Sequence, residues 1–133
     1  MRFGVLADTG PLYAAVDLND QYHRRAQPEL TELAEARLDI IIAYPTLFET
    51  YTLVLYRLGI RTSLSWLREI QTGSTLVAPT VEDYHAAGQK LLKFPDQSIT
   101  LFDALVSVLA ARAKIPVWTY DHHFEVMRSR VWR

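Results

Sequence analysis

Cysteine is absent from the 133 residues of this chain. Its absence excludes disulfide bonds and thiolate metal sites, and it is typical of proteins from a reducing compartment. Long hydrophobic runs are also missing, since none approaches the ~20 residues that a transmembrane helix needs. The N-terminus lacks the basic region, apolar stretch and cleavage site of a signal peptide. We therefore expect a cytoplasmic protein that does not act at a membrane.

Neither sign of charge is in excess, because 14 basic and 15 acidic residues leave a net charge of −1. Binding to a nucleic acid would therefore depend on a local basic patch. A basic C-terminal region comprises Arg112, Lys114, Arg128, Arg130 and Arg133. It would either bind along an RNA backbone or simply be solvated. Length and a hydrophobic content of 50% are ordinary for one globular domain, which we expect over residues 1–133.

Four short apolar runs recur along the chain without a polar–apolar alternation, as in strands that are covered on both faces. They are residues 3–7 (FGVLA), 39–43 (DIIIA), 75–78 (TLVA) and 115–120 (IPVWTY). Helical segments are predicted between them, at residues 20–36 with Asp20 as cap, 45–58, from 62 or 63 onward, 80–94 with a capping box, and from 98 or 100 to 113. Strands that alternate with helices predict an α/β fold with a mainly parallel sheet.

Two aspartates follow the first and the last predicted strands. Asp8 ends the first strand and Asp121 ends the last. Ligands of open parallel sheets bind beyond the carboxyl ends of the strands, so both side chains are expected at the binding edge. Helix capping is the competing explanation, because each aspartate precedes a possible helix and aspartate is a favoured N-cap.

Two further acids stand alone in apolar helices. Glu49 is the only acid in residues 45–58, and Asp103 is the only acid in residues 100–113. We expect both in the first turns of their helices, where the helix dipole contributes about 0.3–1 kcal/mol. That contribution is smaller than the cost of desolvating an unpaired charge. No base stands near Asp103 on its helix, since Arg112 is more than two turns away.

Convergence of these carboxylates would require protons or cations, because two charges ~4 Å apart repel by roughly 4 kcal/mol at an effective dielectric constant of about 20. Oxygen ligands favour Mg²⁺ or Mn²⁺ over Zn²⁺. Such an ion on an open carboxylate site is typical of phosphodiester chemistry. The adjacent His122 and His123 lack the i, i+4 spacing of a helical zinc pair, so we expect no zinc site there.

Four stretches in this order resemble the PIN-domain ribonucleases, and most closely the VapC-like toxins of toxin–antitoxin pairs. They are LADTGPLYAAVDLNDQYHRRA (6–26), LFE (47–49), DQSITLFDALVSVLA (96–110) and TYDHHF (119–124). The resemblance implies a three-layer α/β/α fold, dependence on Mg²⁺ or Mn²⁺, and endonucleolytic hydrolysis of single-stranded or structured RNA. It also implies a small antitoxin partner and a homodimer.

The resemblance assigns the four acids of the family to Asp8, Glu49, Asp103 and Asp121. Asp8, Asp103 and Asp121 are expected to hold the metal, while Glu49 joins them or orients the attacking water. Thr119 is the family's hydroxyl residue, which would fix a ligand carboxylate or a phosphate oxygen. The roles of Asp96, which a loop position explains as well, and of His123 stay open.

An antitoxin would silence the site by inserting an arginine or lysine among the carboxylates. The helices around Tyr13, Leu47, Tyr51 and Leu55 are expected to form the groove for its apolar anchors. One alternative function is a PIN-like module that binds RNA or protein without cutting it. A phosphoacceptor receiver domain fits poorly, because the third strand ends in Val-Ala-Pro without an aspartate.

Overall fold

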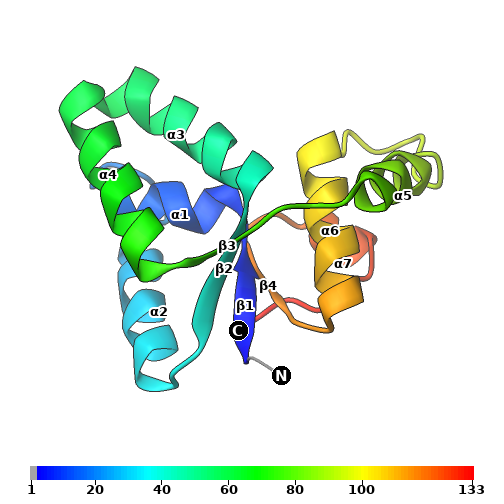
Figure 1. Ribbon diagram of the computed structural model, residues 1–133, viewed down its shortest axis with the longest axis horizontal. Helices are drawn as coiled ribbons and strands as arrows, with labels where there is room; N and C mark the ends of the chain where they lie inside the picture. The colour runs from blue at the N-terminus through cyan, green and yellow to red at the C-terminus, as the bar shows by residue number, and fades with distance from the viewer. Residues whose placement is uncertain (1–2) are drawn as a thin grey trace.

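Residues 3–133 are described by a computed structural model (Figure 1). Four parallel strands form its central sheet in the order β3-β2-β1-β4. They are β1 (Gly4–Ala7), β2 (Asp39–Ala43), β3 (Thr75–Val77) and β4 (Val117–Trp118). All four lie within the predicted runs, so the parallel α/β class is confirmed.

The last strand is much shorter than the predicted run 115–120. Pro116 has no N–H to donate, although its carbonyl accepts a hydrogen bond from the Leu6 N–H at 2.9 Å. The C-terminal segment covers the outer edge of Val117. The Val117 N–H donates to the Arg130 carbonyl, and the Trp132 N–H donates to the Val117 carbonyl, both at 2.8 Å. The sheet therefore ends against the end of the chain.

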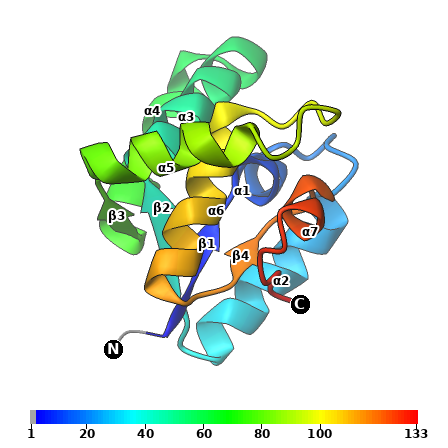
Figure 2. The same ribbon diagram turned by 90° about the vertical axis from the view of Figure 1, so that its right-hand side faces the viewer.

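Helices cover both faces of the sheet, which confirms the three-layer α/β/α architecture (Figure 1). One face carries α1 (Thr9–Val16), α2 (His23–Glu35), α3 (Tyr44–Leu58) and α4 (Ile60–Gly73). The other carries α5 (Val81–Leu91), α6 (Leu101–Ala113) and α7 (His123–Val126). Figure 2 shows α5 lying across α6, with α7 beside the C-terminal end of the chain. No helix within residues 3–133 has the length and apolar character to cross a membrane.

The two layers of helices pack on separate cores, because successive side chains of a strand point to opposite faces. Val5 and Ala7 contribute to the core under α1–α4, which also contains Trp66 and Trp118. Leu6 contributes to the other core, together with Phe124 and most of the buried face of α6.

Several helix boundaries differ from their predicted positions. Asp20 does not cap α2, which begins at His23; its Oδ1 accepts from the Tyr22 N–H at 2.8 Å within the preceding turn. The α4 helix begins at Ile60 rather than at 62 or 63, because Gly59 at φ 91° reverses the chain directly after α3. The capping box of Thr80 and Asp83 is present, although α5 ends at residue 91 instead of 94.

The strand order places a switch point between β1 and β4. The chain runs outward from β1 to β2 and β3, and then crosses the sheet through α5 and α6 to add β4 on the other side of β1. Register pairs Ala7 with Trp118, and the Asp8 N–H donates to the Trp118 carbonyl at 2.9 Å. The residues that follow β1 and β4 are thus neighbours at the edge where ligands of such sheets bind.

Candidate active site

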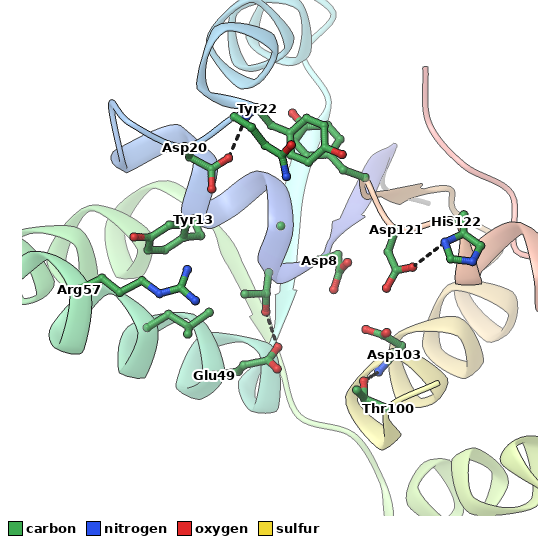
Figure 3. A pocket seen from close by; sticks show the side chains of 15 residues that line it. Asp8, Tyr13, Asp20, Tyr22, Glu49, Arg57, Thr100, Asp103, Asp121 and His122 are labelled. Carbon is green, nitrogen blue, oxygen red and sulfur yellow. Dashed lines mark hydrogen bonds and ion pairs between the residues drawn. The ribbon is translucent and has the colours of Figure 1, made fainter. Parts of the chain in front are cut away.

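A cavity of about 510 Å³ opens at this edge of the sheet (Figure 3). Its acidic lining includes all four carboxylates that the sequence singled out, namely Asp8, Glu49, Asp103 and Asp121. They come from the end of β1, from α3, from the start of α6 and from the segment after β4. The fold thus joins acids that lie up to 113 positions apart in the chain.

Asp8 occupies the N-cap position of α1 but makes no side-chain capping hydrogen bond. Its Oδ2 instead accepts a hydrogen bond from the Thr119 hydroxyl at 2.8 Å. The Thr119 Oγ1 in turn accepts from the Asp121 backbone N–H at 3.0 Å, and Thr119 is only 4% exposed. Thr119 therefore orients one carboxylate and the backbone that carries another, while its burial keeps it away from a phosphate.

Asp121 lines the cavity and also closes the turn that precedes α7. Its Oδ1 accepts from the His123 N–H at 2.9 Å, and the Nδ1 atoms of His123 and His122 lie 3.3 and 3.7 Å from it. Within residues 3–133, these three residues form the one group whose potential metal-ligand atoms all lie within 4.8 Å of one another. The two histidines approach the same carboxylate without the i, i+4 spacing of a helical zinc pair, because His122 precedes the helical turns of α7.

Glu49 faces the cavity from the second turn of α3 rather than from the first, since this helix begins at Tyr44. The Thr9 hydroxyl donates to its Oε1 at 2.5 Å. Thr50, which is fully buried, lies 3.2 Å from the same Thr9 oxygen and donates to the Thr46 carbonyl at 2.8 Å. The hydroxyl contacts hold Glu49 on the α3 side of the cavity, apart from the three aspartates (Figure 3).

Asp103 lies in the first turn of α6, as predicted, and its N–H donates to the Thr100 cap. Burial, and then the charges of Asp8 and Asp121, raise the pKa of Asp103 to about 8. Burial is also the main cause that raises the pKa of Asp8 to about 6, and repulsion from Asp121 and Glu49 adds to it, although the Thr119 hydrogen bond opposes the rise. Both shifts come first from burial and then from repulsion between the carboxylates, and within the described part of the chain no cation nearby offsets either cause.

No ion pair among residues 3–133 involves Asp8, Glu49 or Asp103. Arg112, the base nearest to Asp103 along α6, instead forms a bidentate pair with Asp83 at 2.8 and 2.9 Å. Repelling carboxylates with only oxygen atoms to offer fit a hard divalent cation, which would lower their pKa values. The donor set therefore suits Mg²⁺ or Mn²⁺.

One basic side chain on the cavity wall escaped the sequence reasoning. Arg57 is the single arginine or lysine among the described lining residues, and its guanidinium lies 5.1 Å from the Tyr13 ring centroid. It follows Glu49 and Leu53 at intervals of four residues, so all three project from one side of α3. This spacing was visible in the sequence and could have located Arg57.

Burial bears on two other expectations. Asp96 is exposed and absent from the cavity lining, which favours its explanation as a loop residue. Of the residues expected around the antitoxin groove, Tyr13 and Leu47 are each 4% exposed, whereas Tyr51 and Leu55 are half-buried, and the groove stays a prediction. Phe48 on α3 and Phe102 on α6, which directly precede the cavity residues Glu49 and Asp103 in the chain, are exposed apolar side chains.

The sequence profile of the PIN domain matches residues 5–129. The chain belongs to the PIN domain family. A comparison with curated protein sequences gave no significant match. Among solved structures, this PIN domain is similar to VapC20 of Mycobacterium tuberculosis, described as a sarcin–ricin loop cleaving toxin. Identity is 19%, the TM-score is 0.84, and 98% of this chain and 99% of that chain are covered.

Two further structures share the fold of this PIN domain. VapBC2 of Rickettsia felis, bound to a DNA fragment from its promoter, is 14% identical with a TM-score of 0.76, over 97% of this chain and 96% of that chain. FitAcB of Neisseria gonorrhoeae is 16% identical with a TM-score of 0.68, over 97% and 96%. At such identities the likeness establishes the common fold.

Proposed function

We propose that this PIN domain is a metal-dependent endoribonuclease and the toxin of a toxin–antitoxin pair. One observation carries the proposal: Asp8, Asp103 and Asp121 line one cavity at the switch point of the sheet. The pKa values of Asp8 and Asp103 are raised, and neither of these two carboxylates has an ion pair within residues 3–133. A purely structural role would not require three acids from separate elements to crowd one cavity.

In this proposal Asp8, Asp103 and Asp121 hold Mg²⁺ or Mn²⁺, and Glu49 joins them or orients the attacking water. The bound ion supplies positive charge that neutralises the phosphate and promotes ionisation of that water. Thr119 keeps the Asp8 carboxylate in place, and Thr9 does the same for Glu49. Arg57, on the cavity wall, is placed to pair with a phosphate oxygen of the RNA.

Cleavage of RNA with Mn²⁺, with Mg²⁺ and with EDTA tests this proposal. The substrates are a single-stranded RNA and a hairpin, because VapC20 is described as cleaving a structured RNA loop. We expect cleavage by the wild type in either metal, none in EDTA, and a loss of at least about 100-fold in Asp103→Asn. Asp96→Asn is the matched control, since it removes an exposed aspartate outside the cavity and should cleave like the wild type.

If the wild type binds RNA but cuts neither substrate with either metal, the non-catalytic binding module replaces the nuclease. Equal activity of Asp103→Asn and Asp96→Asn would remove the cavity from the reaction.

The likeness to the VapBC2 and FitAcB structures supports a small antitoxin partner. We propose that the antitoxin inserts an arginine or lysine among the carboxylates and seats apolar side chains near Phe48 and Phe102. We also propose a homodimer and a cytoplasmic location. Expression of the chain alone should slow growth, and co-expression of the adjacent small reading frame should restore it; harmless expression at a high level would contradict the toxin.

A further inference from the structure

Two hollows of about 250 and 660 Å³ adjoin one another near the C-terminal end of α6, and neither shares a lining residue with the acidic cavity. They share Lys90 and Arg128, and they lie between the second half of α5, the second half of α6 and the chain after α7. We call them together the basic hollow. Its five cationic residues are Lys90, Lys93, Lys114, Arg128 and Arg130.

Among the described residues 3–133, no aspartate or glutamate lines either hollow. Two acids of the neighbouring elements are paired with other cations, Asp83 with Arg112 at 2.8 Å and Glu125 with Arg133 at 2.5 Å. A molecule with a net charge of −1 thus concentrates unneutralised positive charge on one surface.

None of the ion pairs among residues 3–133 involves the cations of the basic hollow. Arg130 donates to the Lys114 carbonyl at 3.0 Å, which fixes these two chain segments beside each other. Beneath them the Ser107 and Ser129 hydroxyls are hydrogen-bonded at 2.7 Å and join α6 to the C-terminal segment. The positive charges are therefore carried by a built framework rather than by a loose end of the chain.

The half-buried Lys90 shows that this framework is maintained at an energetic cost. Burial, and then the charge of Lys93, lower the pKa of Lys90 below its usual value. The two lysines stand at i and i+3 on α5 and its extension, where like charges repel. An anionic ligand would relieve both penalties.

We propose that the basic hollow binds the phosphate backbone of the RNA substrate at a distance from the cleaved bond. Five cations spread over three chain segments suit a row of phosphates better than a single anion, which two or three donors would satisfy. Lys114 follows Asp103 by 11 positions, or about 16 Å along α6. This distance equals roughly five stacked nucleotides at ~3.4 Å each, so a stacked tetranucleotide is too short to contact both places.

The proposal rests on the proposed nuclease function for the identity of the RNA as substrate, but its test does not require cleavage. Binding of a labelled 20-nucleotide RNA hairpin is measured by fluorescence anisotropy in EDTA over a range of NaCl concentrations. The test variant is Lys90→Gln/Lys93→Gln/Arg128→Gln, and Lys90→Arg/Lys93→Arg/Arg128→Lys keeps the charges and should bind like the wild type.

The matched control removes three exposed cations from the other half of the molecule, through Arg37→Gln, Arg61→Gln and Arg68→Gln together. Each triple variant also replaces one arginine with a left-handed backbone conformation, Arg37 at φ 56° in the control and Arg128 at φ 61° in the test variant. Thermal melts of all the proteins verify that they are folded.

We expect the slope of log affinity against log salt to decrease by about two in the test variant, at roughly 0.7–0.9 for each lost contact. The affinity for the hairpin then falls about 100-fold at ~0.1 M salt, because a slope difference of two acts over one decade below 1 M. The control variant should bind like the wild type, and cleavage of a tetranucleotide with Mn²⁺ should be equal in all the proteins.

Equal RNA binding by the test and control variants would overturn the proposal, whether both lose affinity or neither does. Binding to poly-glutamate, measured in the same way, separates an acidic protein from RNA as the ligand. Loss of poly-glutamate binding with unchanged RNA binding in the test variant would overturn the proposal in favour of a protein partner. Failure of the wild type to cleave any RNA would refute the nuclease, whereas a changed salt slope would still establish the basic hollow as an RNA site.

Discussion

Substitution of Asp103 by asparagine should change how the stability of the metal-free protein depends on pH. In the folded protein the pKa of Asp103 is raised to about 8, whereas in the unfolded chain the side chain has its ordinary pKa of 3.8. The folded state therefore binds more protons over this range, and the free energy of unfolding must fall as the pH rises through it. The stability is fully present below the unfolded pKa and is lost as the pH passes the folded pKa.

The magnitude follows from the number of retained protons. One proton held only by the folded state gives a slope of about 1.4 kcal/mol per pH unit. From about pH 6 to about pH 7.5, Asp103 alone accounts for a loss of at most about 2 kcal/mol. Asparagine carries no titrating group and removes the repulsion, so Asp103→Asn should lose correspondingly less and should match or exceed wild-type stability at about pH 7.5.

Urea denaturation in EDTA at several pH values measures this difference, with Asp96→Asn as the matched control. Other titrating groups are common to all three proteins and are controlled for by the comparison. Identical slopes for Asp103→Asn and the wild type would refute the reasoning. A loss of more than about 1 kcal/mol in Asp103→Asn at about pH 7.5 would mean that Asp103 mainly stabilises the first turn of α6.

Addition of a divalent metal provides the complementary measurement. An ion that binds only the folded state, at a concentration of about 100 times its Kd, stabilises the protein by about 2.7 kcal/mol. We expect Mn²⁺ or Mg²⁺ to raise the melting temperature of the wild type and of Asp96→Asn, but not that of Asp103→Asn. An equal rise in all three would place the bound ion elsewhere.

Three further predictions concern the contacts that hold the site and the sheet. Thr119→Val removes the hydrogen-bond donor to Asp8, so NMR titration should show a still higher pKa for the Asp8 carboxyl. The free energy of unfolding at neutral pH should fall by about 1–2 kcal/mol. An unchanged pKa would contradict the hydrogen bond. Burial alone would raise the pKa of Asp83, but its hydrogen bonds outweigh burial and lower the pKa. Arg112→Gln should therefore reduce the free energy of unfolding at pH 7 by about 1 kcal/mol in urea denaturation. The difference from the wild type should vanish as the pH falls through the pKa of Asp83. Gly4→Ala would place a Cβ 2.6 Å from a backbone carbonyl oxygen of β2 and should destabilise the protein by about 1–3 kcal/mol. If the variant is as stable as the wild type in urea denaturation, the two strands can separate locally.

The sequence by itself determined the class of the fold and the chemistry of the candidate site. Uninterrupted apolar runs separated by helical segments predict a parallel sheet, because only strands covered on both faces lack polar alternation. The acids stood out for a related reason: Glu49 and Asp103 are single charges in apolar helices, where an unpaired carboxylate is costly. Both signals are local in the chain and can be recognised without coordinates.

The tertiary structure alone decided which groups face each other. The Thr119–Asp8 hydrogen bond joins residues 111 positions apart and depends on the register of β4 against β1. The neutralisation of Asp83 by Arg112 likewise depends on how α5 crosses α6, and the same packing brings Lys90 of α5 beside Lys114 and Arg128 in the basic hollow. Such contacts follow from the packing of whole helices and strands. The spacing of residues along the chain does not predict this packing, because the same local pattern is compatible with many registers.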